Sequence, residues 1–382
     1  MKFVSWHPVL TDHQSFTVAA LAEAAGSAPT IYVANITHAE RQAQGWVSKH
    51  ALSLRPQLIP KHGWLSFALG ALRKHRDAVH IFSGPFENIK QTLTLIMALM
   101  LGLRVYLISE PYSSAPIGHL NDKRPWINRL KSKLRPLLYS MYGLLLRRRL
   151  RGVFAISPRA VAQYAQIGIP AERIFPFGYF VPYQDTVDTA TAPVAGPAAT
   201  RIIFVGSLIK TKGLDLLITA VEHINSCGGA VTIDVYGPGD TQNFRFDNEK
   251  VRYCGVIPFG CAQRQIAQYD ILVLPSRYDG WGVVVNEALM AGVPVVCSGQ
   301  VGAGAVVEKW KCGVTFASEN VGDLVSKLQR SMIPENLRNM RTAAVTAGAT
   351  LQPMVAAQYM FDIIGKDDAD GARTKPECPW YE

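Results

Sequence analysis

The sequence predicts an α/β protein built from two doubly wound, Rossmann-like domains that face each other across a cleft. Its 382 residues exceed the ~100–200 that one domain usually holds. With 48% hydrophobic and 18% charged residues, the composition is typical of a folded chain with an apolar core. Short apolar runs alternate with longer helical stretches, a pattern that indicates parallel strands joined by helices.

In the first half of the chain, five short apolar runs predict strands. Each run is too short for a helix and ends in turn residues. The predicted strands cover 2–6, 30–34, 79–82, 105–108 and 153–156, and predicted helices between them include 16–25 and 89–101.

The second half repeats the alternation with its own strands and helices. The predicted strands are 201–205, 232–236, 271–274 and 294–297, followed by helices at 214–225, 283–291 and 323–330. Between the halves, residues 185–200 are rich in Ala, Thr and Pro and show no periodicity, which is typical of a linker. We therefore predict a domain over 1–182, a linker over 183–200, a second domain over 201–352 and a terminal segment over 353–382.

The two halves differ in charge. Residues 1–182 hold 22 basic and 8 acidic residues, whereas residues 183–382 hold 17 and 21, so the total of +10 comes from the first half. An anionic surface or partner is therefore expected to dock on the first domain.

Several classes of protein are excluded. Residues 1–10 hold one lysine and are interrupted by His7 and Pro8, so we predict no signal peptide. The most apolar stretch, 93–108, is shorter than the ~20 residues of a membrane span and contains Arg104. The six cysteines form no CxxC pair, so we expect buried thiols in a reducing cytoplasm and neither a disulfide frame nor a zinc site. We expect no cofactor. The cysteines are Cys227, Cys254, Cys261, Cys297, Cys312 and Cys378.

The first motif, RIIFVGSLIKTKG, covers residues 201–213. A strand ends at Gly206, and a short loop then carries Ser207, Lys210 and Lys212. Because ligands of open α/β sheets bind at the carboxyl ends of strands, these lysines are candidates for contact with a phosphate. A plain strand–turn–helix connection with solvated lysines would give the same pattern.

The second motif, PSRYDGWGVVVNEALMAGVPVV, covers residues 275–296. Glycines before a helix allow the backbone to approach a diphosphate, whose charge the free amides and the helix dipole favour. Glu287 lies about five residues into this helix, ~7 Å beyond its start, which suits the hydroxyls of a ribose. Asp279, on the preceding loop, would face the sugar. The motif therefore predicts a nucleotide-sugar site that includes Arg277, Gly280, Trp281, Gly282, Val283 and Val284.

These residues resemble the retaining nucleotide-sugar glycosyltransferases of the GT-B fold, specifically the large family four, over 201 to about 316. The family's E-x7-E motif falls on Asp279 and Glu287, and its phosphate-binding lysine on Lys212. Two positions depart from the family: Ser207 replaces an arginine, and Asp279 replaces a glutamate that is one methylene longer. Lys210 or Arg277 is a candidate for the missing positive charge.

Two further segments fit the resemblance. VTIDVYGPGD at 231–240 places Gly237 after a strand, as in the family's loop beside the nucleotide. VRYCGVIP at 251–258 matches the segment that usually contacts the base, here Val256, Ile257 and Pro258. The resemblance also implies that a helix near 354–364 crosses back onto the first domain.

In the first domain, Glu110 follows a strand and is expected to point into the cleft. It stands where the family often has a histidine, so it is either an acceptor contact or proton acceptor, or a loop acid that caps a helix. His13, in the first strand–helix loop, is a candidate contact for the acceptor or the donor phosphate.

Residues 123–151 contain ten basic residues and no acidic one, with Trp126, Leu130, Leu134, Leu138 and Met141 at helical spacing. Basic residues beside an apolar face are typical of a helix that lies on an anionic membrane. Pro136 is expected to divide the segment into two helices. Nucleic acid is the other polyanion that fits the charge, but no recognition motif accompanies it.

Together with the family resemblance, which implies retention, these patterns predict a glycosyltransferase that moves a sugar from a nucleoside-diphosphate sugar to a lipid-linked or polysaccharide acceptor. Asp279, Lys212 and Glu110 are the expected catalytic residues, without a metal. We place the protein on the cytoplasmic face of a bacterial cell membrane, in surface polysaccharide synthesis. The alternatives are a nucleotide-sugar epimerase of the same fold and a non-catalytic nucleotide-sugar-binding partner.

Overall fold

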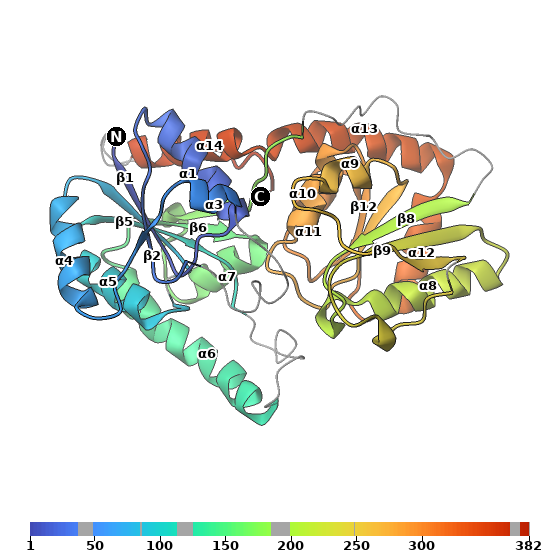
Figure 1. Ribbon diagram of the computed structural model, residues 1–382, viewed down its shortest axis with the longest axis horizontal. Helices are drawn as coiled ribbons and strands as arrows, with labels where there is room; N and C mark the ends of the chain where they lie inside the picture. The colour runs from blue at the N-terminus through green and yellow to red at the C-terminus, as the bar shows by residue number, and fades with distance from the viewer. Residues whose placement is uncertain are drawn as a thin grey trace.

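The computed structural model has two lobes side by side, each with a central sheet (Figure 1). It describes residues 1–36, 49–84, 86–112, 125–184, 199–247, 249–366 and 375–381. Residues 185–198 of the linker predicted over 183–200 lie outside the described residues, as do Lys123 and Arg124.

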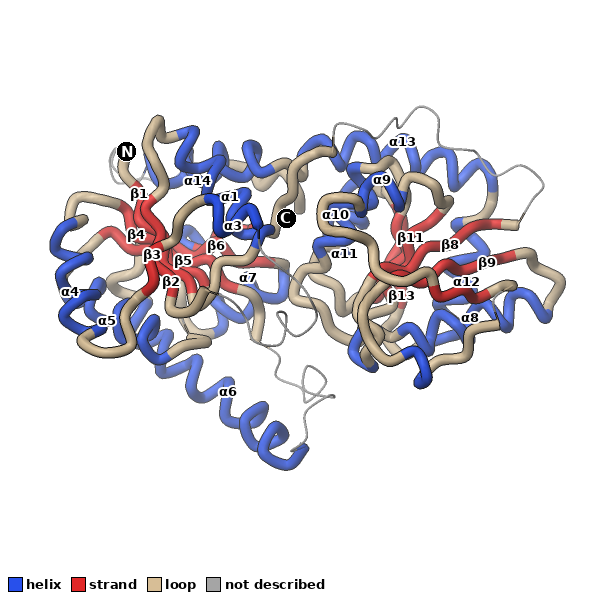
Figure 2. Tube along the Cα trace, viewed as in Figure 1, coloured by secondary structure: helices blue, strands red, loops and turns tan. Residues whose placement is uncertain are grey.

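The first lobe holds a parallel seven-stranded sheet in the order β3-β2-β1-β4-β5-β6-β7. Most of these strands are fully buried apolar runs, as expected for a parallel sheet covered on both faces by helices (Figure 2). The strands are β1 (Phe3–His7), β2 (Thr30–Val33), β3 (Gln57–Leu58), β4 (Val79–Ser83), β5 (Arg104–Ser109), β6 (Gly152–Ile156) and β7 (Ile174–Phe177). The helices are α1 (Asp12–Ala24), α3 (Lys49–Ser53), α4 (Trp64–Lys74), α5 (Ile89–Met100), α6 (Pro125–Leu146) and α7 (Pro158–Gln166).

The second lobe holds a parallel six-stranded sheet in the order β10-β9-β8-β11-β12-β13. Its strands are β8 (Thr200–Val205), β9 (Val231–Tyr236), β10 (Val251–Tyr253), β11 (Ile271–Leu274), β12 (Val295–Ser298) and β13 (Gly313–Phe316). Its helices are α8 (Leu214–Ser226), α9 (Ala262–Ile266), α10 (Val283–Met290), α11 (Gly304–Trp310), α12 (Val321–Ser331) and α13 (Pro334–Thr350). The strand order reverses between β1 and β4 in one sheet and between β8 and β11 in the other, which confirms two doubly wound domains.

The C-terminal part of the chain returns to the first lobe. Helix α14 (Pro353–Lys366) packs against α1, as Figure 1 shows. Beyond it, Trp380 and Tyr381 are buried where the two lobes meet. The Tyr381 hydroxyl accepts hydrogen bonds from the backbone N–H groups of Ser157 and Phe177, both at 2.9 Å, so the chain end ties β6 to β7.

The prediction of two helices around Pro136 is wrong. Helix α6 is continuous from Pro125 to Leu146 and contains Pro136. A proline removes one backbone hydrogen bond and crowds the carbonyl four residues earlier. Because α6 is exposed over much of this stretch, water can satisfy the freed carbonyl, and the helix passes through the proline without ending.

Buried histidines make the first domain sensitive to acid. Burial lowers the pKa of His80 to about 4. Its Nδ1 accepts a hydrogen bond from Trp6 Nε1 at 3.1 Å, and its Nε2 donates to the carbonyl of His75 at 3.0 Å, so the ring must stay neutral. The unfolded chain binds a proton near pH 6.5, so it gains protons first as the pH falls. Stability is therefore lost between pH 6.5 and pH 4, by at most about 3 kcal/mol for this residue.

We expect the free energy of urea unfolding, followed by tryptophan fluorescence, to fall between pH 7 and pH 4.5. His80→Gln should be less stable at pH 7 but lose less on acidification. His62→Gln, at an exposed histidine, is the control and should behave as the wild type. An identical acid response of wild type and His80→Gln would contradict this account.

Candidate functional site

The first element of the site is the loop after β8. It passes through Gly206 and the half-buried Ser207 into a short turn, Lys210–Lys212, and enters α8 at Gly213. Gly213 has a φ of 70°, and a Cβ there would overlap the backbone carbonyl of Pro275. The absence of a side chain therefore lets this loop approach the loop after β11.

The two loops meet in an ion pair. Lys212 Nζ lies 2.5 Å from Asp279 Oδ2, with the two side chains 26% and 15% exposed. The structure thus brings together two predicted catalytic residues that lie 67 positions apart. In the free protein, each neutralises the other.

Helix α10 begins beside this pair. Gly282 precedes it with a φ of 92°, and the amides of Val283 and Val284 lie in the first turn, where a helix leaves N–H groups unpaired. Glu287, one turn further, is half-buried, and among the described residues it has no hydrogen-bond or ion-pair partner. Burial raises the pKa of its carboxyl to about 7. A bound ligand with hydroxyl groups would donate hydrogen bonds to this carboxylate.

Arg277 is paired with acidic side chains of its own domain. Its buried guanidinium donates to both carboxylate oxygens of Asp215 at 2.7 Å, to Glu319 at 2.6 Å and to the carbonyl of Lys210 at 2.6 Å. Two carboxylates therefore offset its charge, and its role in this conformation is to hold the lysine loop. Lys210 itself is exposed.

The predicted base-binding residues line an adjacent edge. A Cβ at Gly237 would overlap the carbonyl of Gly206, so the loops after β8 and β9 touch. Next to them, Val256 is 52% exposed, Ile257 is half-buried and Pro258 is exposed. This apolar edge is open to a flat ligand.

Glu110 faces these loops from the first domain. Its Oε1 accepts a hydrogen bond from the Tyr179 hydroxyl at 2.6 Å, and a Cβ on Gly280 would collide with its carboxylate. His13 packs edge-on against the Tyr179 ring, with centroids 4.4 Å apart. Tyr179 therefore joins the two residues predicted for the acceptor side.

Trp281 is buried, and its ring packs on Gly178, which directly follows β7 of the first domain. A Cβ on Gly178 would overlap the ring. Its Nε1 donates to Asn286 at 2.9 Å, and Asn286 donates to the carbonyl of Tyr179 at 2.7 Å. Trp281 therefore anchors the turn that carries Gly280 and Gly282.

Several residues near these loops were not predicted from the sequence. Besides Tyr179, Tyr278 donates to the carbonyl of Pro111 at 2.7 Å and links the two domains. Burial, with a smaller contribution from the nearby carboxylate of Glu110, raises the pKa of Glu87 to about 7. The run FPFGYF at 175–180 was a signal for Tyr179, since aromatic residues cluster at sites of close packing.

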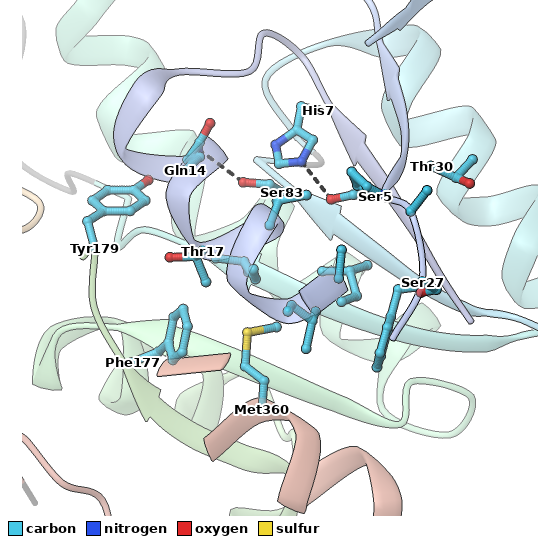
Figure 3. A pocket seen from close by; sticks show the side chains of 18 of the residues that line it. Ser5, His7, Gln14, Thr17, Ser27, Thr30, Ser83, Phe177, Tyr179 and Met360 are labelled. Carbon is cyan, nitrogen blue, oxygen red and sulfur yellow. Dashed lines mark hydrogen bonds between the residues drawn. The ribbon is translucent and has the colours of Figure 1, made fainter. Parts of the chain in front are cut away.

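A small apolar cavity lies under α1, and Tyr179 is among the residues that line it (Figure 3). Figure 3 shows the His7 side chain hydrogen-bonded to Ser5 and the Gln14 side chain hydrogen-bonded to Ser83 at one end of the cavity. Phe177 and Met360 lie at the opposite end. Its volume is about 30 Å³, close to that of one water molecule, so it does not admit a nucleotide sugar. Buried His7 has an unpartnered Nδ1, and burial lowers its pKa to about 3.

Within the described residues, no cluster of His, Cys, Asp and Glu has the arrangement of a metal site. The six cysteines are free thiols. The prediction that they are buried is confirmed for Cys297, Cys312 and Cys378 and is wrong for Cys227, Cys254 and Cys261, which are exposed. None of the described helices is long and apolar enough to cross a membrane.

Comparison with known proteins assigns the domain that carries these loops. The model of the family "Glycosyl transferases group 1" matches residues 199–332, which contain Lys212, Asp279 and Glu287. The second domain is a glycosyl transferases group 1 domain. Solved structures of glycosyltransferases have the same two-domain arrangement, which confirms the predicted GT-B fold.

Among curated relatives, a glycogen synthase of Mycobacterium tuberculosis is 29% identical over 161 residues, 40% of this chain and 38% of the relative. A GDP-mannose-dependent phosphatidylinositol monomannoside mannosyltransferase of the same organism is 26% identical over 244 residues, 59% of each chain. The chain thus covers less than two thirds of either relative.

Two solved structures match nearly the whole of this chain. Anabaena HepE, determined in complex with UDP, has a TM-score of 0.67 at 15% identity and covers 96% of this chain and 100% of its own. WaaG, a glycosyltransferase involved in lipopolysaccharide biosynthesis, has a TM-score of 0.61 at 15% identity, covering 94% and 99%. At these identities, the likeness shows a shared fold alone.

Proposed function

We propose that this protein is a retaining glycosyltransferase that transfers a sugar from a nucleoside-diphosphate sugar to a lipid-linked or polysaccharide acceptor. The observation that carries the proposal is the meeting of Lys212, Asp279 and the start of α10 at the carboxyl ends of β8 and β11, opposite Glu110. Parallel α/β sheets bind their ligands at this reversal of strand order.

The donor would lie along α10. Its diphosphate meets Lys212 and the amides of Val283 and Val284, and its ribose meets Glu287, ~7 Å further along the helix. The base rests on the apolar edge of Val256–Pro258. The UDP of HepE and the GDP-mannose dependence of the mannosyltransferase support this class of donor.

The barrier to transfer lies in the charge that develops on the departing diphosphate. Lys212 and the helix amides stabilise this charge where it forms, and they supply what a metal ion supplies elsewhere. For Lys212 to reach the diphosphate, its ion pair with Asp279 must lengthen. Asp279 is then free to contact the sugar.

The acceptor would approach from the first domain. Glu110, held by Tyr179 and close to Gly280, would accept a hydrogen bond from the hydroxyl that attacks. Its neighbour His13 lies on the same side of the Tyr179 ring. Retention follows from the family resemblance and completes the proposal.

Exposed apolar side chains on α6 support the proposal that the protein acts at the inner face of a cell membrane, in surface polysaccharide synthesis. Leu137, Met141 and Leu144 are 63%, 59% and 62% exposed and follow one face of the helix. Figure 1 shows the N-terminal end of α6 projecting beyond the first domain. Because 123–151 is basic, an anionic membrane fits this face better than a second basic copy does.

We expect the triple change of Leu137, Met141 and Leu144 to Ser to abolish the part of vesicle binding that survives high salt. Insertion of apolar groups is insensitive to salt, whereas attraction between charges is screened. The measurement is co-sedimentation with anionic vesicles at low and high salt. The control changes three other exposed apolar residues of the first domain, Leu58, Leu65 and Ile89, to Ser. Equal losses in both variants would contradict a role of α6.

Thermal shift followed by turnover tests the proposed reaction. A ligand that binds only the folded state raises its stability, so one nucleoside diphosphate among those of uridine, guanosine, thymidine and adenosine should stand out. The matching sugar donor with a membrane extract should then release free nucleoside diphosphate. Isomerised donor without acceptor would identify an epimerase, and binding without turnover would identify a non-catalytic partner.

A further inference from the structure

The arginines at the end of α6 surround a depression far from the cleft. It has a volume of about 490 Å³ and is lined by Arg148, Arg149, Arg151 and Arg173, with Met100 and Leu103 at its edge. It lies where β5 begins, whereas Glu110 follows the end of β5. Six strand residues at ~3.3 Å each separate the two places, so the depression is ~20 Å from the cleft.

Two of the four guanidinium groups are held by backbone carbonyls. Arg173 Nη1 donates to the carbonyls of Arg147 and Leu150, both at 3.2 Å. Arg149 Nη1 donates to the carbonyl of Leu99 at 3.3 Å. These bonds fix the side chains without neutralising them, and their remaining N–H groups stay available.

Three of these arginines have no acidic partner among the described residues. In that part of the chain, Arg148, Arg149 and Arg173 form no ion pair with an acidic side chain. Their like charges around one depression repel each other, and a polyvalent anion relieves that repulsion. Arginine forks match phosphate oxygens in pairs, so the chemistry favours a phosphate group.

Exposed apolar side chains lie in the depression and next to its lining residues in the chain. Met100, which lines it, is 71% exposed. Leu101 follows Met100 and is 43% exposed, and Leu144 lies one helical turn before Arg148 and is 62% exposed. A soluble phosphate would leave these side chains in water. A lipid would cover them with its acyl chains while its headgroup occupies the depression.

We propose that this depression is a binding site for the phosphate headgroup of a membrane lipid, and that it prefers a phosphomonoester. A monoester presents three terminal oxygens to the arginines, whereas a diester presents two. The proposal rests on the membrane location given under the proposed function. It adds a specific headgroup site, outside the donor cleft, that would set the orientation of the first domain on the membrane.

The test separates arginine geometry from charge. Vesicles of phosphatidylcholine carry either phosphatidate or phosphatidylglycerol, adjusted to equal surface potential. Arg148→Lys with Arg149→Lys keeps the charge but removes the forks. The matched control is Arg76→Lys with Arg147→Lys, two exposed arginines that do not line the depression.

We expect wild type and control to bind phosphatidate vesicles about tenfold more tightly than phosphatidylglycerol vesicles, and the Arg148/Arg149 variant to lose this preference. Equal binding of both lipids by wild type, or an unchanged preference in the variant, would overturn the proposal. Displacement by glycerol phosphate at lipid-like concentrations would assign the site to a soluble phosphate and overturn it too.

A parallel thermal shift with the nucleoside diphosphates separates this proposal from the proposed function. The Lys variant should respond to the nucleotide as the wild type does, because the depression is ~20 Å from the cleft. A headgroup preference without any nucleotide response would contradict the proposed function but not the headgroup site. A nucleotide response without a headgroup preference would contradict the headgroup site but not the proposed function.

Discussion

Lys212→Ala should lower turnover at least about a hundredfold while weakening donor binding much less. A cation that meets charge developing on a leaving group acts mainly in the transition state, and the loss of one such group costs ~2.7–4 kcal/mol. The measurement is kcat and KM for release of nucleoside diphosphate from the donor that the thermal shift identifies. Lys210→Ala removes the same charge two residues away and should lose far less. Equal losses would mean that the total charge of the loop matters, and not the position next to Asp279.

Asp279→Asn extends the same experiment. It removes the partner of Lys212, so the lysine is free to bind a diphosphate without first breaking an ion pair. We expect tighter binding of the nucleoside diphosphate product together with slower transfer. Weaker product binding would contradict the competition between Asp279 and the diphosphate.

Glu287→Ala should weaken donor binding about 10- to 100-fold, because the ribose hydroxyls lose a charged acceptor worth ~1.5–3 kcal/mol. The half-buried carboxyl also makes binding depend on pH. Its pKa of about 7 in the free protein means that it is partly protonated at neutral pH. Donor affinity should therefore rise as the pH increases from 6 to 8, since the charged form is the better acceptor.

The Gln variant isolates this effect. Glu287→Gln keeps the shape of the side chain and one acceptor oxygen but cannot titrate, so its donor affinity should be lower and nearly flat over the same pH range. Isothermal titration at several pH values measures both. A pH slope that persists in the Gln variant would assign the titration to another group.

Prediction from the sequence succeeded where the signal was local. A buried parallel strand appears in the sequence as a short apolar run, and the runs predicted at 79–82 and 271–274 became β4 and β11. Strands with weak runs were missed: β3 has two residues, and β7 contains Pro176, which an edge strand tolerates.

The candidate site divides in the same way. The order of the glycines, Lys212, Asp279 and Glu287 along the chain predicted a nucleotide-sugar site, because the loop and helix start that would hold a diphosphate form within about ten residues. The same pattern placed Arg277 and Trp281 among the donor contacts, since both lie within the motif. Their surroundings, however, are set by residues far away in the sequence.

The sequence alone determined the two doubly wound domains and the residues that follow their strands, because hydrophobic periodicity and glycine placement are local properties. Only the tertiary structure decided how those residues pair. Arg277 is held by Asp215 and Glu319, which lie 62 and 42 positions away, and Trp281 packs on Gly178 of the first domain. Glu110 meets Gly280 only because the two sheets face each other. Such contacts depend on how the domains pack, and no local pattern in the chain records that packing.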